Sequence, residues 1–200
     1  MRALNKNRIR DSRIALLIST VILLLAQPLL HYGNNSHEIL EFTGSLLVVF
    51  CAVGRIYTTA FIGGLKNSQL VTWGPYSVTR NPLYLFSLIG ITGIAMIMGF
   101  VSLVIVNIIV FSLLYHFLIT REETFLRNEF GDVYSDYVNR VPRIAPDISL
   151  YQAPPQIAFS PRLLNNALKD AVWWFLAFPM IEGIEYLHQS GLLPSFFTLF

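Results

Sequence analysis

Residues 83–120 read LYLFSLIGITGIAMIMGFVSLVIVNIIVFSLLYHFLIT, a stretch without any Asp, Glu, Lys or Arg. A helix that crosses the hydrocarbon core of a bilayer needs roughly 20 mainly apolar residues, which makes this stretch too long for one crossing. Gly99 permits a turn within it, because glycine adopts the backbone conformations that tight turns require. The stretch therefore predicts two membrane helices that fold back on each other at about residues 98–102.

The composition of the whole chain indicates that lipid surrounds much of it. Hydrophobic residues make up 54% of the 200 residues and charged residues only 13%, whereas soluble domains carry about 25% charged residues. The mean hydropathy is +0.56. A chain of this length has too much surface to bury so many apolar side chains in one water-surrounded core. The sequence predicts an all-α, polytopic membrane bundle.

Three further apolar stretches, 14–30, 39–54 and 171–188, bring the prediction to about five transmembrane helices. The first stretch, with basic residues before it, also fits a secretory signal peptide, but it ends without a small-x-small cleavage site, which favours a retained anchor. Trp173-Trp174 opens the last stretch, as is typical of an aromatic belt at the membrane interface.

The basic residues predict how the helices are oriented. All 14 Lys and Arg residues fall in the segments 2–13, 55–80 and 121–169, which alternate with connections that carry none. Positive charge is retained in the cytoplasm, which places the N-terminus inside and the C-terminus outside. The basic N-terminal segment is interpreted as a topology signal, and no nucleic-acid partner is expected. Size and compactness favour a protein of the bacterial inner membrane, where membrane lipids are its expected partners. The sequence leaves its oligomeric state open.

The chain divides into a two-helix membrane segment (1–62), a core (63–146) and a linker with the last helix (147–200). Within the core, Gly74-Pro75 signals a turn, and Asn81-Pro82 marks the start of the third helix, since proline is tolerated in a first helical turn.

The chain that follows the fourth helix has two further patterns. Apolar residues at helical spacing within 125–130 predict that this helix continues beyond the membrane. Tyr134, Tyr137, Arg140 and Arg143 recur at three-residue steps and predict one face of a short helix, either functional or an anchor on anionic lipid.

Residues 74–84, GPYSVTRNPLY, resemble the Gly-x-Tyr-x-x-x-Arg-His-Pro-x-Tyr signature of the isoprenylcysteine carboxyl methyltransferase and phospholipid methyltransferase family. The predicted hairpin follows, and after it come Glu122-Glu123 and the stretch 130–142, FGDVYSDYVNRVP, which are similar to the paired glutamates and closing pattern of the same family. The resemblance covers roughly residues 63–146. Each motif is weak alone, but their order and spacing across a membrane hairpin make the combination fairly specific.

The resemblance implies a membrane methyltransferase that uses S-adenosyl-L-methionine, held at the cytoplasmic face by the two segments that flank the hairpin. Asn81 stands where the family has histidine, and Phe86 where a glycine often follows the last tyrosine, two departures that bear on the substrate more than on the cofactor. Carried over by position, the candidate catalytic residues are Arg121 and Glu122, and the candidate cofactor-binding residues are Leu70, Val71, Tyr76, Asn81, Pro82, Leu83, Tyr84 and Glu122.

These residue types suit methyl transfer from a sulfonium, an in-line displacement in which the protein mainly aligns the two reactants. The carboxylate of Glu122 would offset positive charge on the cofactor, and the rings of Tyr76 and Tyr84 would face a cation or the adenine. No general base is obvious, and a carboxylate acceptor needs none. The sequence therefore favours carboxyl O-methylation over N-methylation, on a lipophilic substrate that enters from the bilayer.

Two other classes of function remain open. A membrane reductase or isomerase would bind a nicotinamide cofactor, but the chain has no glycine-rich dinucleotide motif. A non-catalytic membrane assembly protein would explain the helices and leave the polar motifs without a purpose.

Glu185-x-x-His188, with Glu182 one step earlier, is similar to one half of a di-metal site, yet a second half is missing and no metal is expected. Cys51 is interpreted as a buried structural thiol.

Overall fold

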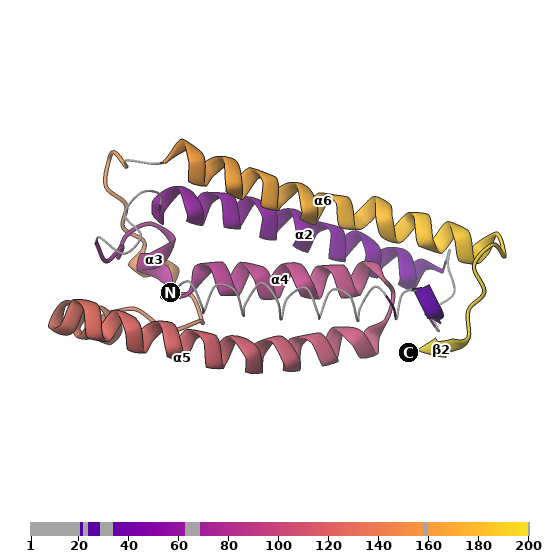
Figure 1. Ribbon diagram of the computed structural model, residues 1–200, viewed down its shortest axis with the longest axis horizontal. Coiled ribbons are helices and arrows are strands. Elements are labelled where there is room, and N and C mark those ends of the chain that lie inside the picture. The colour runs from indigo at the N-terminus through magenta and orange to yellow at the C-terminus, as the bar shows by residue number, and fades with distance from the viewer. Residues whose placement is uncertain (1–20, 22–23, 29–33, 63–68, 158–159, 200) are drawn as a thin grey trace.

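The computed structural model describes residues 21, 24–28, 34–62, 69–157 and 160–199. Helices α2, α4, α5 and α6 run lengthwise beside one another, with α3 at one end of the bundle and the two short strands at the other (Figure 1). The elements in chain order are β1 (Ala26–Pro28), α2 (Asn35–Ile62), α3 (Pro75–Val78), α4 (Pro82–Ile97), α5 (Val101–Arg140), the 3-10 turn η1 (Ile148–Leu150), α6 (Pro161–Gln189) and β2 (Phe197–Leu199).

The predicted hairpin is confirmed by α4 and α5, which are joined by a short turn that contains Gly99. This glycine has a φ of 72°, a left-handed conformation that glycine adopts at little cost. Pro82 lies in the first turn of α4, as its position predicts. The extension of α5 beyond its apolar part is also confirmed, since the helix runs to Arg140 with one break at Gly131.

Among the described helices, α2 and α5 are long and apolar enough to cross a membrane. Helix α4 is apolar but has 16 residues, which at ~1.5 Å per residue span roughly 24 Å, less than the ~30 Å hydrocarbon core. Helix α6 starts at Pro161, ahead of the predicted stretch, and Glu182, Glu185 and His188 lower the hydropathy of that stretch. The structure is helical and contains two helices that could cross a membrane, and the predicted five crossings are not confirmed.

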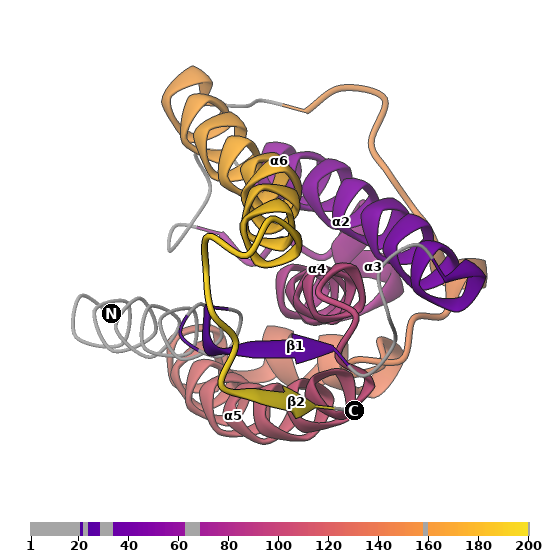
Figure 2. The same ribbon diagram turned by 90° about the vertical axis from the view of Figure 1, so that its right-hand side faces the viewer.

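The first predicted helix, 14–30, lies mostly outside the described residues. Within it, Ala26–Pro28 form strand β1, and a helix through these residues is therefore wrong. They pair in parallel with Phe197–Leu199, Ala26 opposite Phe197, and Figure 2 shows the pair beside the ends of the helices. Pro28 lacks the backbone N–H that an interior helical position supplies, and its strand partner is more than a hundred residues away in sequence, where local patterns give no signal.

Helices α2 and α4 approach so closely that their backbones touch. A Cβ on Gly44 would lie 2.5 Å from the carbonyl oxygen of Gly93, a distance that real side chains do not tolerate. A Cβ on Gly54 would collide with the ring of Phe86. The bulky Phe86, which departs from the family pattern, is thus accommodated by a glycine on the facing helix.

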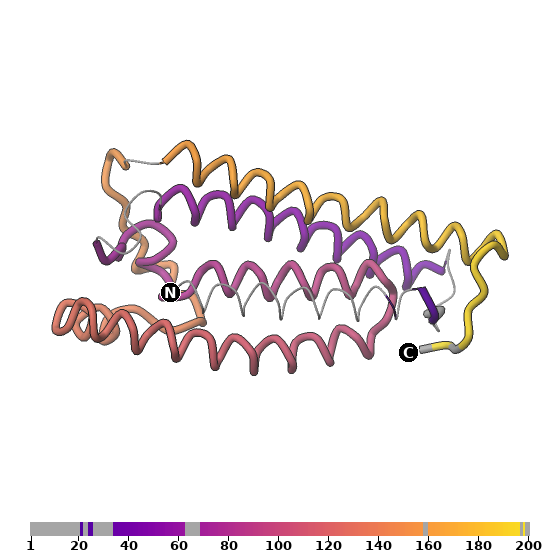
Figure 3. The backbone as a smooth tube through the Cα atoms, viewed as in Figure 1, coloured from indigo at the N-terminus to yellow at the C-terminus, as the bar shows by residue number. Residues whose placement is uncertain are grey.

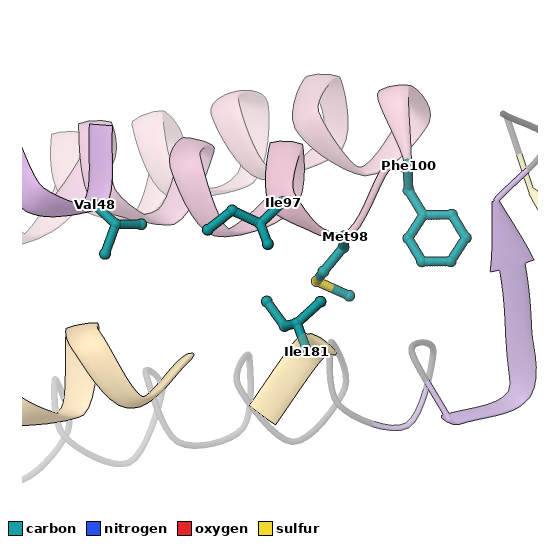
Figure 4. Packing of buried hydrophobic residues seen from close by; sticks show 5 residues of the cluster. All are labelled: Val48, Ile97, Met98, Phe100 and Ile181. Atoms are coloured by element: carbon teal, nitrogen blue, oxygen red, sulfur yellow. The ribbon is translucent and has the colours of Figure 1, made fainter. Parts of the chain in front are cut away.

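A buried apolar cluster closes the bundle near the α4–α5 turn. It takes Val48 from α2, Ile97 and Met98 from the end of α4, Phe100 from the turn and Ile181 from α6 (Figure 4). The backbone trace shows α6 following α2 along the bundle (Figure 3). This packing fixes one end of the α4–α5 hairpin, and the polar segments gather at the opposite end.

Candidate functional site

Two segments far apart in the sequence lie antiparallel at the α3 end of the bundle: residues 74–81 and residues 141–152, here called the strap. The N–H of Gly74 donates to the carbonyl of Gln152 at 2.6 Å, and the N–H of Arg80 donates to that of Pro142 at 2.9 Å. Between them the N–H of Asp147 donates to the carbonyl of Val78 at 3.0 Å. The strap therefore holds the signature segment in place through backbone hydrogen bonds.

Tyr76 is the buried centre of the signature segment. Its carbonyl accepts a 2.7 Å hydrogen bond from the hydroxyl of Tyr137, on the last turns of α5. Burial raises the pKa of the Tyr76 phenol, and the negative charge of Glu122 raises it further. The phenol consequently stays protonated and neutral, within the electrostatic influence of a carboxylate from the other side of the hairpin.

Tyr84 and Glu122 meet where α4 begins and the apolar part of α5 ends. The Tyr84 hydroxyl donates to Oε2 of Glu122 at 3.1 Å. The Tyr84 ring meets Tyr115 edge-on with centroids 5.0 Å apart, and Tyr115 meets Phe111 in the same way at 5.8 Å. The Glu122 carboxylate thus lies at one end of a row of three aromatic rings, Tyr84, Tyr115 and Phe111. This row, called the aromatic column below, extends along the apolar part of α5.

Glu123 joins the three polar segments of the site. Its Oε1 lies 3.0 Å from Nη1 of Arg80, and its Oε2 lies 3.0 Å from Nη2 of Arg143. The side chain of Arg80 is only 13% exposed and that of Glu123 19%, which makes these ion pairs partly desolvated. Arg143 was not among the predicted site residues, and Glu123 was noted only as the second member of the glutamate pair.

Asn81 fastens the strap to the start of α4. Its Nδ2 donates to the carbonyl of Arg143 at 3.0 Å, and the neighbouring Thr79 hydroxyl donates to the carbonyl of Ile144 at 3.2 Å. Asn81 occupies the N-cap position of α4 without making a side-chain cap. The amide that replaces the family histidine therefore serves as a hydrogen-bond donor to the backbone.

The other predicted site residues occupy different surroundings. Leu70 packs against a buried cluster of Tyr134, Tyr137 and Val141, and Val71 is itself buried. Pro82 is fully buried, Leu83 is half-buried, and Arg121 is exposed on α5. The structure brings Tyr76, Tyr84 and Glu122 together and leaves Arg121 on the surface.

The predicted common face of Tyr134, Tyr137, Arg140 and Arg143 is wrong. Both tyrosines are buried, Arg140 is exposed, and α5 ends at Arg140, before Arg143. The reason is Pro142, which disfavours a helical conformation in the residue before it. The chain turns away from the helix there, and the side chain of Arg143 reaches back to α5 from the strap.

Sequence reasoning also missed an ion pair that joins three helices at the α3 end. Nε and Nη2 of Arg55 donate to Oδ2 of Asp170 at 3.1 and 2.5 Å, and Nη1 donates to the hydroxyl of Ser87. The guanidinium lies 5.9 Å from the ring centre of Trp174. The sequence pattern that could have predicted this ion pair is an arginine near the end of one apolar helix and an aspartate near the start of another.

The acidic and histidine residues of α6 lie at the opposite end of the bundle. Nε2 of His37 is 3.8 Å from Glu185 Oε1, and its Nδ1 is 3.9 Å from Glu41 Oε2. Nε2 of His188 is 3.3 Å from the carbonyl of Leu24. Among the described residues, no group of three or more His, Cys, Asp and Glu side chains is arranged to hold a metal ion.

The described part of the chain combines long apolar helices, a hairpin, and a polar site of carboxylate, tyrosine and arginine side chains at one end of that hairpin. Comparison with known families gives a match to phospholipid methyltransferase over residues 42–133, a segment that includes the signature, the hairpin and both glutamates. The chain belongs to the phospholipid methyltransferase family, which confirms the resemblance seen in the sequence.

Two curated relatives are similar over most of the chain. The cobalt-zinc-cadmium resistance protein CzcN of Cupriavidus metallidurans is 31% identical over 167 residues, 84% of this chain and 77% of the relative. The nickel-cobalt-cadmium resistance protein NccN of Alcaligenes xylosoxydans xylosoxydans is 30% identical over 156 residues, 78% of this chain and 73% of the relative. No solved structure matches the chain.

Proposed function

We propose that this protein transfers a methyl group from S-adenosylmethionine to a lipophilic substrate. The observation that carries the proposal is the 3.1 Å hydrogen bond between Tyr84 and Glu122. These two residues lie in different family motifs, on either side of an apolar hairpin, and the charge of Glu122 also acts on the buried Tyr76. The family to which the chain belongs supports methyl transfer as the reaction at this contact.

The side chains present fit S-adenosylmethionine, which supplies an electrophilic methyl group on a sulfonium when bound. Glu122 offers a carboxylate to the cofactor's positive charge, and the rings of Tyr84 and Tyr115 offer faces that attract cations. Arg80, the cation of the signature segment, suits the cofactor's carboxylate, because a guanidinium binds a carboxylate through charge-assisted hydrogen bonds. The protein's contribution is to hold donor and acceptor in line.

We favour a carboxylate as the methyl acceptor. An amine would have to lose a proton, and the carboxylate at the site, Glu122, is assigned here to the positive charge of the cofactor. A carboxylate acceptor forms its new O–C bond without a base while the bond to sulfur breaks, and the electron pair of that bond stays on sulfur. The aromatic column of Tyr84, Tyr115 and Phe111 would receive the apolar part of the substrate from the bilayer.

We also propose that the protein is a multi-pass protein of the bacterial inner membrane with the site facing the cytoplasm. The described basic residues belong to the end of α2, the signature segment, the end of α5, the strap and the start of α6. These parts of the chain all gather at the α3 end of the bundle (Figure 1). Retention of positive charge in the cytoplasm supports this orientation.

Calorimetry of the detergent-solubilised protein tests the activity. We expect S-adenosylhomocysteine, the product of methyl transfer, to bind with a stoichiometry of about one per chain, because one site is assembled from single copies of its motifs. NADPH, titrated in the same way, should release no heat of binding. Binding of NADPH without S-adenosylhomocysteine would favour the reductase, and binding of neither would favour a non-catalytic protein.

The names of the two relatives favour a biological role in metal resistance for the same activity. Both are named as resistance proteins for cobalt, cadmium and a third divalent metal. We expect a strain that lacks this gene to grow poorly on cobalt or cadmium salts and the wild-type gene to restore growth. The Glu122→Gln variant should fail to restore it. Full restoration by that variant would show that resistance does not depend on methyl transfer.

A further inference from the structure

The stretch of chain that leads from α5 to α6 carries almost no charge. Residues 144–161 contain no Lys, Arg or Glu, and Asp147 is their one charged side chain, whereas soluble domains carry about 25% charged residues. The carboxylate of Asp147 is turned back on the chain, where its Oδ1 accepts from the N–H of Ser149 at 3.0 Å and from the Ser149 hydroxyl at 2.6 Å. This composition favours apolar surroundings over water.

Apolar side chains project from the strap at its 3-10 turn, η1. The side chain of Ile148 is 78% exposed, the highest value among the large apolar side chains that the structure describes. Tyr151 is also exposed, and its N–H donates to the carbonyl of Ile148 at 3.1 Å, so that both side chains belong to the same turn. Adjoining exposed apolar side chains mark a surface that another apolar body covers.

The backbone of this turn is prepared for surroundings without water. Its N–H groups donate hydrogen bonds within the protein at Asp147, Ser149, Leu150, Tyr151 and Gln152. Pro146, directly before them, has no N–H to satisfy. A backbone polar group that enters lipid without a partner is costly, because lipid offers no replacement for water. The turn can therefore approach acyl chains at little cost.

The turn lies at the depth where α2 leaves its apolar part. Helix α2 is long and apolar enough to cross a membrane, and Tyr57 continues, at steps of three or four residues, an exposed apolar stripe of Phe42, Leu46, Val49 and Val53. The Tyr57 hydroxyl lies 2.6 Å from that of Tyr151. In Figure 2 the chain between α5 and α6 passes α2 on the side away from α4. The strap thus adjoins the end of the apolar stripe.

We propose that η1 is a membrane anchor, which inserts Ile148 into the lipid interface at the α3 end of the bundle. The occupant of the exposed surface is the bilayer, because the apolar stripe of α2 leads directly to it and the paired tyrosines Tyr57 and Tyr151 suit the membrane–water boundary. The inference requires α2 to cross the membrane. It does not depend on the proposed methyl transfer.

An anchor at this place fixes the depth of the signature segment. The N–H of Asp147 donates to the carbonyl of Val78 at 3.0 Å, and the N–H of Gly74 donates to that of Gln152 at 2.6 Å. The strap therefore cannot leave the interface without breaking its bonds to residues 74–81 or moving them. Insertion of the turn holds this end of the bundle at a constant level in the leaflet.

Fluorescence quenching in vesicles tests the anchor. The full chain, with a fluorophore attached to Ile148→Cys, is reconstituted into phosphatidylcholine vesicles that contain a phosphatidylcholine with a nitroxide near the headgroup end of its acyl chain. Native Cys51 is fully buried and is not expected to react with the label. We expect the nitroxide lipid to remove roughly half of the fluorescence, because an inserted side chain lies within the headgroup and acyl boundary.

Two labelled controls bracket this result. Val53→Cys, on the exposed stripe of α2, should be quenched by the nitroxide lipid, and Asn128→Cys, exposed on the polar extension of α5, should not be. Iodide, present on both sides of the vesicles, should quench the label at Asn128 and spare the label at Ile148.

Three outcomes would overturn the anchor. Quenching of the Ile148 label by iodide as strong as at Asn128, without quenching by the nitroxide lipid, would place the turn in water. Protection from both quenchers would show that protein, such as a second copy of the chain, covers the turn. Absence of nitroxide quenching at Val53 would remove the membrane crossing of α2 on which the inference rests.

Discussion

Replacing Glu122 by glutamine is expected to weaken the binding of S-adenosylmethionine by roughly 10–100-fold, the loss that removal of a hydrogen bond to a charged group produces. Glutamine still accepts the hydrogen bond from Tyr84, and the change therefore removes charge without removing the contact. S-adenosylhomocysteine lacks the sulfonium and should lose less affinity. Calorimetry with both ligands in detergent measures the difference.

The control for this variant is Glu129→Gln, which removes the same charge from an exposed position on α5. It should bind both ligands as the wild type does. Equal losses for the two ligands in Glu122→Gln would assign Glu122 to the amino group or ribose of the cofactor in place of the sulfonium. Unchanged affinity in Glu122→Gln, and also in Tyr84→Ala, would refute the site.

Replacing Glu123 by glutamine is expected to have the largest effect on stability. The carboxylate bridges Arg80 and Arg143 at 3.0 Å each, and its loss leaves two guanidinium groups side by side in a partly buried position. Breaking such a pair typically costs roughly 3–5 kcal/mol, because the remaining charge is uncompensated. A lower apparent Tm in thermal unfolding would show the effect.

A second substitution separates charge from packing. If unpaired charge causes the loss, the double variant Glu123→Gln/Arg143→Gln should be more stable than Glu123→Gln alone, because one of the two like charges has been removed. A double variant as unstable as the sum of the two single variants would indicate that the side chains act independently. An unchanged Tm in Glu123→Gln would contradict the bridge itself.

The parts of the fold that the sequence predicted are those that depend on local pattern. The apolar stretch and Gly99 define the hairpin, Pro82 marks the start of α4, and apolar spacing after residue 120 predicts the continuation of α5. Each of these features follows from the preferences of neighbouring residues. The meeting of Tyr84 and Glu122 follows from the same hairpin, because an antiparallel pair of helices returns the chain to its starting level.

The parts that the sequence did not predict depend on contacts between distant segments. The strap is hydrogen-bonded to residues 74–81 through its own backbone N–H and carbonyl groups, which no side-chain pattern reveals. The pairing of Ala26–Pro28 with Phe197–Leu199 is of the same kind. Arg143 was assigned to a helical face because its spacing continued that of Tyr137, whereas Pro142 ends the helix first.

The ion pair between Arg55 and Asp170 has a consequence for how this architecture can be divided. Arg55 lies inside the segment shared with the family, and Asp170 lies beyond its end at residue 133. A chain cut after the strap would keep the cation and lose the anion that neutralises it, together with the Trp174 ring beside it. Helix α6 is thus part of the same packing unit as α2 and α4, and a chain cut after the strap should be less stable than the full chain.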